Sequence, residues 1–165
     1  MKIKAVHPFE LDVDQVMGVF FDRDLISRRN DLMGCRRVEI IRLDRGEDEA
    51  HLEIVRDMQP SAKVPGALRS FQRDWNRVTQ REHWRRVGKN EWTCEYRVHI
   101  ADVPARLTGQ MQLQANDKGC ANHVELDVDC RIPFLGHKVA DFLGEDSALK
   151  IDREYEVILD LIAQP

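Results

Sequence analysis

Hydrophobic and polar residues alternate with a period of two along three stretches in the second half of the chain. In the stretch 91–100, polar or charged residues alternate with Trp92, Cys94, Tyr96, Val98 and Ile100. The stretches 105–114 and 123–132 repeat this pattern. One apolar and one polar face is typical of strands in an antiparallel sheet with one buried side. Earlier strands are predicted at 2–7, 37–43, 50–58 and 77–87, joined by turns with glycine and aspartate.

Two short helices are predicted between the first two strands. Asp12 is a candidate N-cap, Gln15 completes a capping box, and Leu11 with Val16 forms a hydrophobic staple. A second helix is expected to begin near Asp24 and to stop at Gly34, since glycine suits a left-handed C-cap.

A long amphipathic helix is predicted from about His137 to Ala163, with an apolar side that includes Phe142, Leu149, Tyr155 and Leu159. Gly144 is a candidate position for an interruption. A helix of this length spans roughly 40 Å and a ten-residue strand about 33 Å, so a curved sheet can wrap lengthwise around it. A short helical insert is also predicted near 65–75, where Pro65 suits a first helical position.

The order of strand, two helices, six strands and a long helix resembles the helix-grip fold of the START-like (SRPBCC) superfamily. This α+β group includes birch-pollen-allergen-like proteins, lipid-transfer START domains, polyketide cyclases and coenzyme Q-binding proteins. The segment Ile132-Pro-Phe-Leu-Gly136, the stretch from Pro60 to Pro65 and the strand around Trp84 are similar to a branch known only as a domain of unknown function. The resemblance implies a single domain, 1–165, with about seven antiparallel strands curved around the C-terminal helix.

Such a resemblance implies a cavity between the sheet and the long helix that binds an apolar or amphipathic molecule such as a lipid, quinone or polyketide. Large and small residues mix on the inward face, which is one way to leave space unfilled, and Gly109 within a strand indicates a bend, a bulge or a close approach. Solid packing of the sheet on the helix would use the same residues. The side chains expected to line a cavity are Trp92, Tyr96, Met111, Val128, Phe142 and Tyr155.

Motifs for covalent catalysis such as GxSxG, Walker A, GxGxxG and HExxH are absent from the sequence. A cyclase or dehydratase that uses the same cavity is the alternative function, with Tyr96 as the residue whose hydroxyl would be tested first. His137, Asp141 and Glu145 could share one helix face, but acidic residues near a helix start are expected from the macrodipole alone. We therefore expect no metal, no cofactor and no catalytic residue.

An arginine row runs through the middle of the chain, with Trp75 and Trp84 interleaved; its members are Arg69, Arg73, Arg77, Arg81, Arg85 and Arg86. Residues 117–165 hold 11 acidic and five basic residues, so pairing of the row with this acidic part is expected. Nucleic acid is not expected as a partner, since such domains are usually strongly basic. A protein-interaction module that uses the row, a homodimer and an anionic lipid surface are further options.

Composition agrees with an ordinary soluble domain. The 165 residues carry 25 lysines and arginines against 29 acidic residues, a net charge of −4. No apolar run approaches the roughly 18 residues of a membrane span, and the first 15 residues lack the features of a secretion signal. The four cysteines form no CxxC pair, which favours reduced thiols over disulfides or zinc. We expect a cytoplasmic protein without integral membrane contact.

Overall fold

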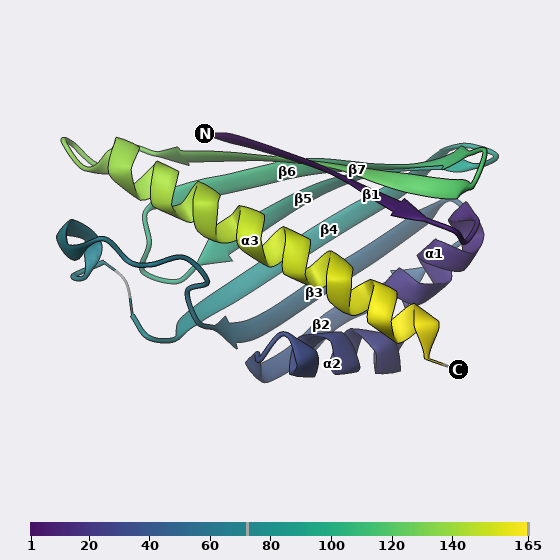
Figure 1. The fold of residues 1–165 in the computed structure, drawn as a ribbon, viewed down its shortest axis with the longest axis horizontal. Helices are drawn as coiled ribbons and strands as arrows, with labels where there is room; N and C mark the ends of the chain where they lie inside the picture. The colour runs from purple at the N-terminus through teal and green to yellow at the C-terminus, as the bar shows by residue number, and fades with distance from the viewer. Residues whose placement is uncertain (72, 165) are drawn as a thin grey trace.

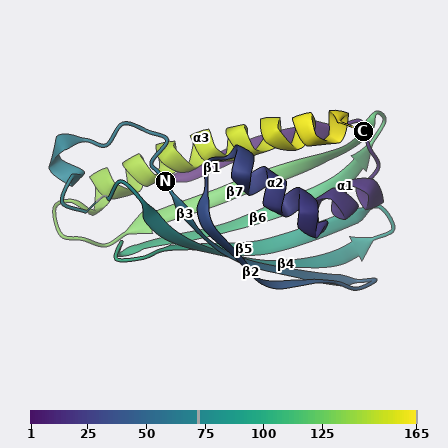
Figure 2. The same ribbon diagram turned by 90° about the horizontal axis from the view of Figure 1, so that it is seen from below.

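Seven antiparallel strands form one curved sheet, and three helices lie against one of its faces (Figures 1 and 2). The computed structural model describes residues 1–71 and 73–164. In chain order the elements are β1 (Lys2–Phe9), α1 (Val13–Phe20), α2 (Arg23–Leu32), β2 (Arg36–Arg45), β3 (Glu49–Met58), a 3₁₀ turn (Gly66–Leu68), β4 (Asn76–Gly88), β5 (Glu91–Ile100), β6 (Ala105–Asn116), β7 (Gly119–Cys130) and α3 (Gly136–Ala163).

The strand order in the sheet is β1-β7-β6-β5-β4-β3-β2, with every neighbouring pair antiparallel. The first strand therefore pairs with the last, and α1 and α2 carry the chain to the opposite edge. Helix α3 then runs diagonally over the face of the sheet against which α1 and α2 also lie (Figure 1). This arrangement confirms the predicted helix-grip α+β class.

The helix starts near the N-terminus follow the sequence signals. Asp12 accepts a hydrogen bond from the Gln15 amide at 2.8 Å, and the Gln15 side chain accepts one from the Asp12 amide at 3.0 Å. This confirms the capping box. Helix α2 begins at Arg23 with Asp22 as its N-cap, close to the prediction, and Gly34 follows it with a φ of +74°.

Two expectations for α3 are wrong. The helix is continuous through Gly144, and this glycine instead lets the Met1 and Ile3 side chains lie close to α3: a Cβ there would lie 2.3 Å from the Met1 sulfur. Leu149 and Leu159, expected on the apolar side, are exposed. The buried side of α3 is narrower than the sequence suggested and includes Phe142 and Leu143.

The helical insert predicted near 65–75 is only a three-residue 3₁₀ turn, and position 72 lies outside the described residues. Leu68 is buried, but Phe71 is partly exposed, so no apolar face supports a longer helix here. The preceding loop is fixed to α3 instead, because the Asp146 carboxylate accepts hydrogen bonds from the Ser61 and Ala62 amides.

Within the arginine row, Arg77, Arg81 and Arg85 lie on the outer face of β4, Arg69 and Arg73 lie in the loop before it, and Arg86 turns to the inner face, where it pairs with Asp14 of α1. The predicted pairing of the row with residues 117–165 is wrong. The row's ion pairs, within the part of the chain that the structure describes, are made with Asp14, Glu39, Asp48, Glu49, Glu53, Asp57, Glu95 and Asp102. The reason is topological: β4 lies between β3 and β5, so its outward arginines meet cross-strand acids there, whereas α3 covers the opposite face.

Gly109 is a site of close approach, one of the three options the sequence left open. It lies opposite Tyr96 in the β5–β6 register, and the Tyr96 ring crosses over it so that the hydroxyl donates to the Glu125 carbonyl on β7 at 3.2 Å. A Cβ at position 109 would lie 2.2 Å from the Tyr96 ring and 2.5 Å from the Glu125 carbonyl oxygen.

None of the helices among the described residues combines the length and the apolar character needed to cross a bilayer.

Gly109→Ala is expected to destabilise the fold by about 1–3 kcal/mol, because the added methyl group collides with a buried ring and a backbone carbonyl. Gly66→Ala is the matched control, since a Cβ there meets nothing within 4 Å. Urea unfolding of both variants measures the difference. Equal free energies of unfolding for the two variants would contradict the close approach.

Candidate functional site

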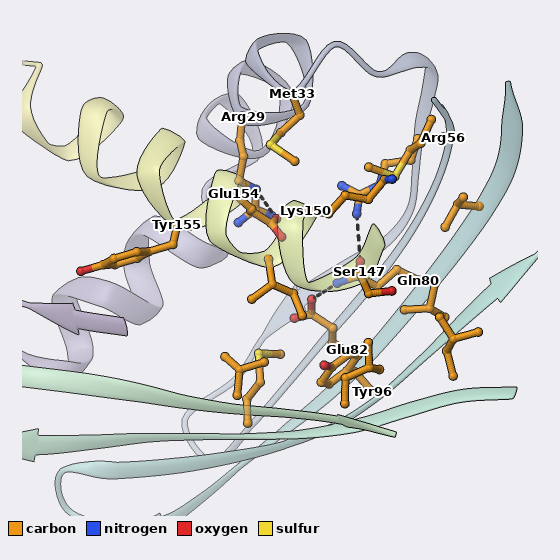
Figure 3. A pocket seen from close by; sticks show the side chains of 18 of the residues that line it. Arg29, Met33, Arg56, Gln80, Glu82, Tyr96, Ser147, Lys150, Glu154 and Tyr155 are labelled. Atoms are coloured by element: carbon orange, nitrogen blue, oxygen red, sulfur yellow. Dashed lines mark hydrogen bonds and ion pairs between the residues drawn. The ribbon is translucent and has the colours of Figure 1, made fainter. Parts of the chain in front are cut away.

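A cavity of about 150 Å³ lies between the inner face of the sheet and α3 (Figure 3). Strands β1 and β3–β7 and all three helices contribute side chains to it. Most of the wall is apolar and is built from Phe9, Phe20, Val78, Trp84, Val98, Ile100, Leu107, Val124, Leu126, Leu143, Ile151 and Ile158. Three methionines, Met33, Met58 and Met111, also line it.

Three of the six residues that the sequence analysis placed at a ligand line this cavity: Tyr96, Met111 and Tyr155. Trp92, Val128 and Phe142 are buried in the surrounding core and lie outside the lining set. The alternation pattern places a side chain on the inner face, but it does not show how far along each strand the cavity extends.

A chain of hydrogen bonds crosses the β3–β4 side of the cavity. The Arg56 guanidinium donates to Asn30 Oδ1 at 2.5 Å and to Gln80 Oε1 at 2.9 Å. The Gln80 amide then donates to Glu82 Oε1 at 2.6 Å, and the Trp84 indole donates to Glu82 Oε2 at 2.8 Å. Gln80, Glu82 and Trp84 alternate along β4 and therefore all point inward.

Glu82 is a carboxyl group held inside the molecule by neutral donors. Burial raises its pKa above the ordinary value of 4.5, and the hydrogen bond from Trp84 opposes this shift. Nearby, Arg29 is already paired with Glu154, with 3.2 Å between Arg29 Nε and Glu154 Oε1. Glu82 can therefore donate a proton or accept a hydrogen bond at the cavity wall.

Helix α3 supplies the opposite wall. Ser147 faces the cavity from this helix (Figure 3). Lys150 is held by an ion pair to Asp146 one turn earlier. Further along α3, Tyr155 stacks on His7 with ring centroids 4.3 Å apart and donates to the Pro8 carbonyl at 2.5 Å. Burial lowers the pKa of His7, which favours its neutral form.

The hydroxyls of both tyrosines are engaged by backbone carbonyls. Tyr96 donates to Glu125 and Tyr155 to Pro8, and burial raises the pKa of each hydroxyl, most strongly for Tyr96. Each tyrosine is thus held in place by the sheet. Neither is as well suited to proton transfer as Glu82.

Comparison with protein families matches residues 4–162 to a family described as "Protein of unknown function (DUF2505)". The chain belongs to the DUF2505 family. The comparison with curated proteins gives no match for this DUF2505 chain.

Solved structures similar to this DUF2505 chain have a START-like fold. Ara h 8.0201 is 12% identical with a TM-score of 0.61, and the match covers 100% of this chain and 99% of the Ara h 8.0201 chain. The protein TTHA0849 from Thermus thermophilus is 13% identical with a TM-score of 0.59, and the match covers 98% of this chain and 99% of TTHA0849. Human STARD10 is 12% identical with a TM-score of 0.58, and the match covers 96% of this chain and 63% of STARD10. These likenesses show the fold.

The polar side of the cavity is what sequence reasoning missed in this DUF2505 chain. On β4, Gln80 and Glu82 occupy inward positions, which are mostly apolar in the three strands with clear alternation. Arg56 does the same on β3. A usable signal existed: polar residues at inward positions of two consecutive strands predict a shared buried network.

Replacement of Glu82 by Gln is expected to change how stability depends on pH. Because the folded state holds the Glu82 proton to a higher pH than the unfolded chain, the free energy of unfolding falls as pH rises from about 4.5 through the raised pKa. The Glu82→Gln variant lacks this fall. Chemical unfolding of both proteins between pH 4 and 8 measures it, and parallel stability curves would contradict a raised pKa at Glu82.

Glu125→Gln is the control with the opposite sign. The hydrogen bond and charge of Lys4 lower the pKa of Glu125, so the ionised carboxylate stabilises the folded state and this stabilisation is lost as pH falls. The difference in unfolding free energy between the wild type and Glu125→Gln is therefore small and rises with pH, whereas the difference for Glu82→Gln falls with pH.

Proposed function

We propose that this protein binds an apolar or amphipathic small molecule, of the lipid, quinone or polyketide class, in the cavity between the sheet and α3. The observation that carries the proposal is the cavity's division into an apolar wall and a polar side. Ligand sites in proteins typically combine predominantly apolar walls with a few placed polar groups. START-like folds are ligand-binding folds in general, which supports the same proposal.

The size of the cavity limits what enters it without rearrangement. Its volume of about 150 Å³ is below the roughly 300–1,000 Å³ of most ligand sites and similar to that of an engineered cavity that binds benzene. A single ring or the end of an acyl chain fits this space. A larger ligand requires wall side chains to move, and Met33, Met58 and Met111 are suited to this because methionine is flexible and unbranched.

The polar side orients the ligand. An apolar body lies against Val124, Leu126 and Leu143, while a hydroxyl, carbonyl or amine turns toward Glu82 and Gln80. A protonated Glu82 donates to a ligand oxygen, and an ionised Glu82 accepts from a ligand donor. Ligand binding by this scheme needs no covalent step and no cofactor.

The cyclase or dehydratase alternative requires an acid or base that faces the ligand. Glu82 meets this requirement better than Tyr96, whose hydroxyl already donates to a backbone carbonyl. In a Glu82→Gln variant that still binds its ligand, loss of substrate conversion would favour this alternative, and unchanged conversion would exclude Glu82 from it.

Ser147→Trp is expected to weaken ligand binding at least about tenfold, because the indole fills space that the ligand needs. Leu149→Trp is the matched control, since Leu149 lies on the same helix but is exposed. Thermal shift and calorimetric titration with fatty acids of 8–16 carbons and with short-chain quinones compare the two variants. Native mass spectrometry of protein purified from its own host tests for a bound natural ligand.

Two results would contradict the proposal. One is the bare polypeptide mass together with no thermal shift of the wild-type protein by any lipid or quinone. The other is equal loss of binding in Ser147→Trp and Leu149→Trp.

A further inference from the structure

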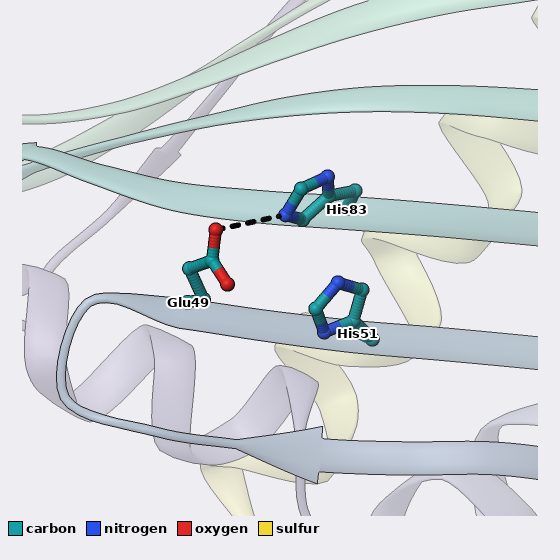
Figure 4. A group of neighbouring side chains, drawn as sticks. All are labelled: Glu49, His51 and His83. Carbon is teal, nitrogen blue, oxygen red and sulfur yellow. Dashed lines mark ion pairs between the residues drawn. The ribbon is translucent and has the colours of Figure 1, made fainter.

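Two histidines and a glutamate meet on the face of the sheet that points away from α3 (Figure 4). His51 on β3 and His83 on β4 are direct cross-strand partners, and Glu49 precedes His51 by two residues on the same strand face. The inward positions of these strands are the even-numbered residues that line the cavity, so these odd-numbered residues face outward. The group is therefore separate from the cavity.

The three side chains are arranged closely enough to share one ion. The imidazole rings stack with centroids 4.3 Å apart and an angle of 16° between their planes. One potential ligand atom from each residue lies within 4.8 Å of the others, and Glu49 Oε1 is 3.4 Å from His83 Nε2. Ligands about 2.0–2.2 Å from a tetrahedral zinc are roughly 3.4 Å apart, so a small rotation of the exposed Glu49 and the rings closes the set.

Two further features point to a ligand at this place. Asp44 Oδ1 lies 3.0 Å from His51 Nδ1, an arrangement that fixes the ring and leaves Nε2 as a metal ligand. Asp44 is itself held by Arg42 Nε at 2.5 Å. On the other ring, His83 Nε2 is inaccessible to solvent and makes no hydrogen bond among the described residues, although Glu49 is near it.

We propose that Glu49, His51 and His83 bind a divalent transition-metal ion such as Zn²⁺ on the outer face of the sheet. Imidazole and carboxylate donors suit this class of metal, and three protein ligands leave one coordination position for water. The ion bridges β3 and β4 and is independent of the proposed ligand in the cavity. No ligand motif in the sequence indicated it, because the antiparallel register alone brings the two histidines together.

Arg85 is the residue that opposes the metal. Its Nη2 lies 3.2 Å from His83 Nδ1, and its guanidinium also lies 4.0 Å from Glu49 Oε1. A guanidinium can only donate, so it favours the tautomer of His83 with the proton on Nε2, the nitrogen that a metal needs. Metal binding therefore requires Arg85 to swing away, and its side chain is exposed enough to do so.

Calorimetric titration of tag-free full-length protein with Zn²⁺, and with Co²⁺ followed by visible absorption, tests the site. We expect one ion per chain. Asp44→Asn weakens binding about tenfold, and His51→Gln, His83→Gln and Glu49→Gln weaken it further. Arg85→Gln tightens it, an effect that a merely structural histidine pair would not produce.

His99→Gln is the matched control, because His99 is exposed on the same outer face at β5. It leaves the affinity unchanged. Glu49 is exposed, so Glu49→Gln keeps the test usable if a histidine variant unfolds. Absence of a one-to-one complex in the wild type, or an affinity that Glu49→Gln and the histidine variants leave intact, would overturn the proposal.

Discussion

The structure depends on the contact between α3 and the inner face of the sheet, and this contact is close for some strands and open for others. Helix α3 packs closely on β7 and β1 and against α2. The inner faces of β3 and β4 lie beyond that close contact and turn their side chains into the remaining space (Figure 3). A single straight helix cannot fill the whole inner face of a wide curved sheet, so the cavity follows from the geometry of the fold.

Arg56, Gln80 and Glu82 occur on the part of the inner face that α3 leaves uncovered. Asn30, Arg56, Gln80, Glu82 and Trp84 form a continuous hydrogen-bonded chain there. A buried polar group without a partner costs roughly 1–3 kcal/mol, and these hydrogen bonds give partners to the Glu82 carboxylate, the Gln80 side-chain amide and the Trp84 indole. Arg56 Nε, by contrast, is buried with no hydrogen-bond partner among the described residues. The network therefore keeps a polar side in an apolar cavity, and it holds Glu82 in a fixed position.

Much of the fold could be predicted from sequence because local signals agree with one another. The capping box at Asp12 and Gln15, the period-two strands and the long C-terminal amphipathic stretch each correspond to a described element. Gly144 was misjudged because a glycine within a helix can also make room for a side chain from elsewhere in the fold, here that of Met1, and this depends on tertiary contact. The short insert was overestimated because Leu68 is buried and Phe71 is not.

The site was harder to predict because it depends on depth along the strands and on register. Tyr96, Met111 and Tyr155 line the cavity while Trp92, at the same inward phase as Tyr96, lies in the core. The outward arginines Arg77, Arg81 and Arg85 find their partners on β2, β3 and β5, which only the strand order reveals.

The most direct test of an unfilled interior is a crystal structure of the protein under xenon pressure, since xenon enters apolar cavities of this size. The account predicts xenon between Val124, Leu126 and Leu143, beneath α3. An interior closed by these side chains, with no xenon between the sheet and the helix, would contradict it.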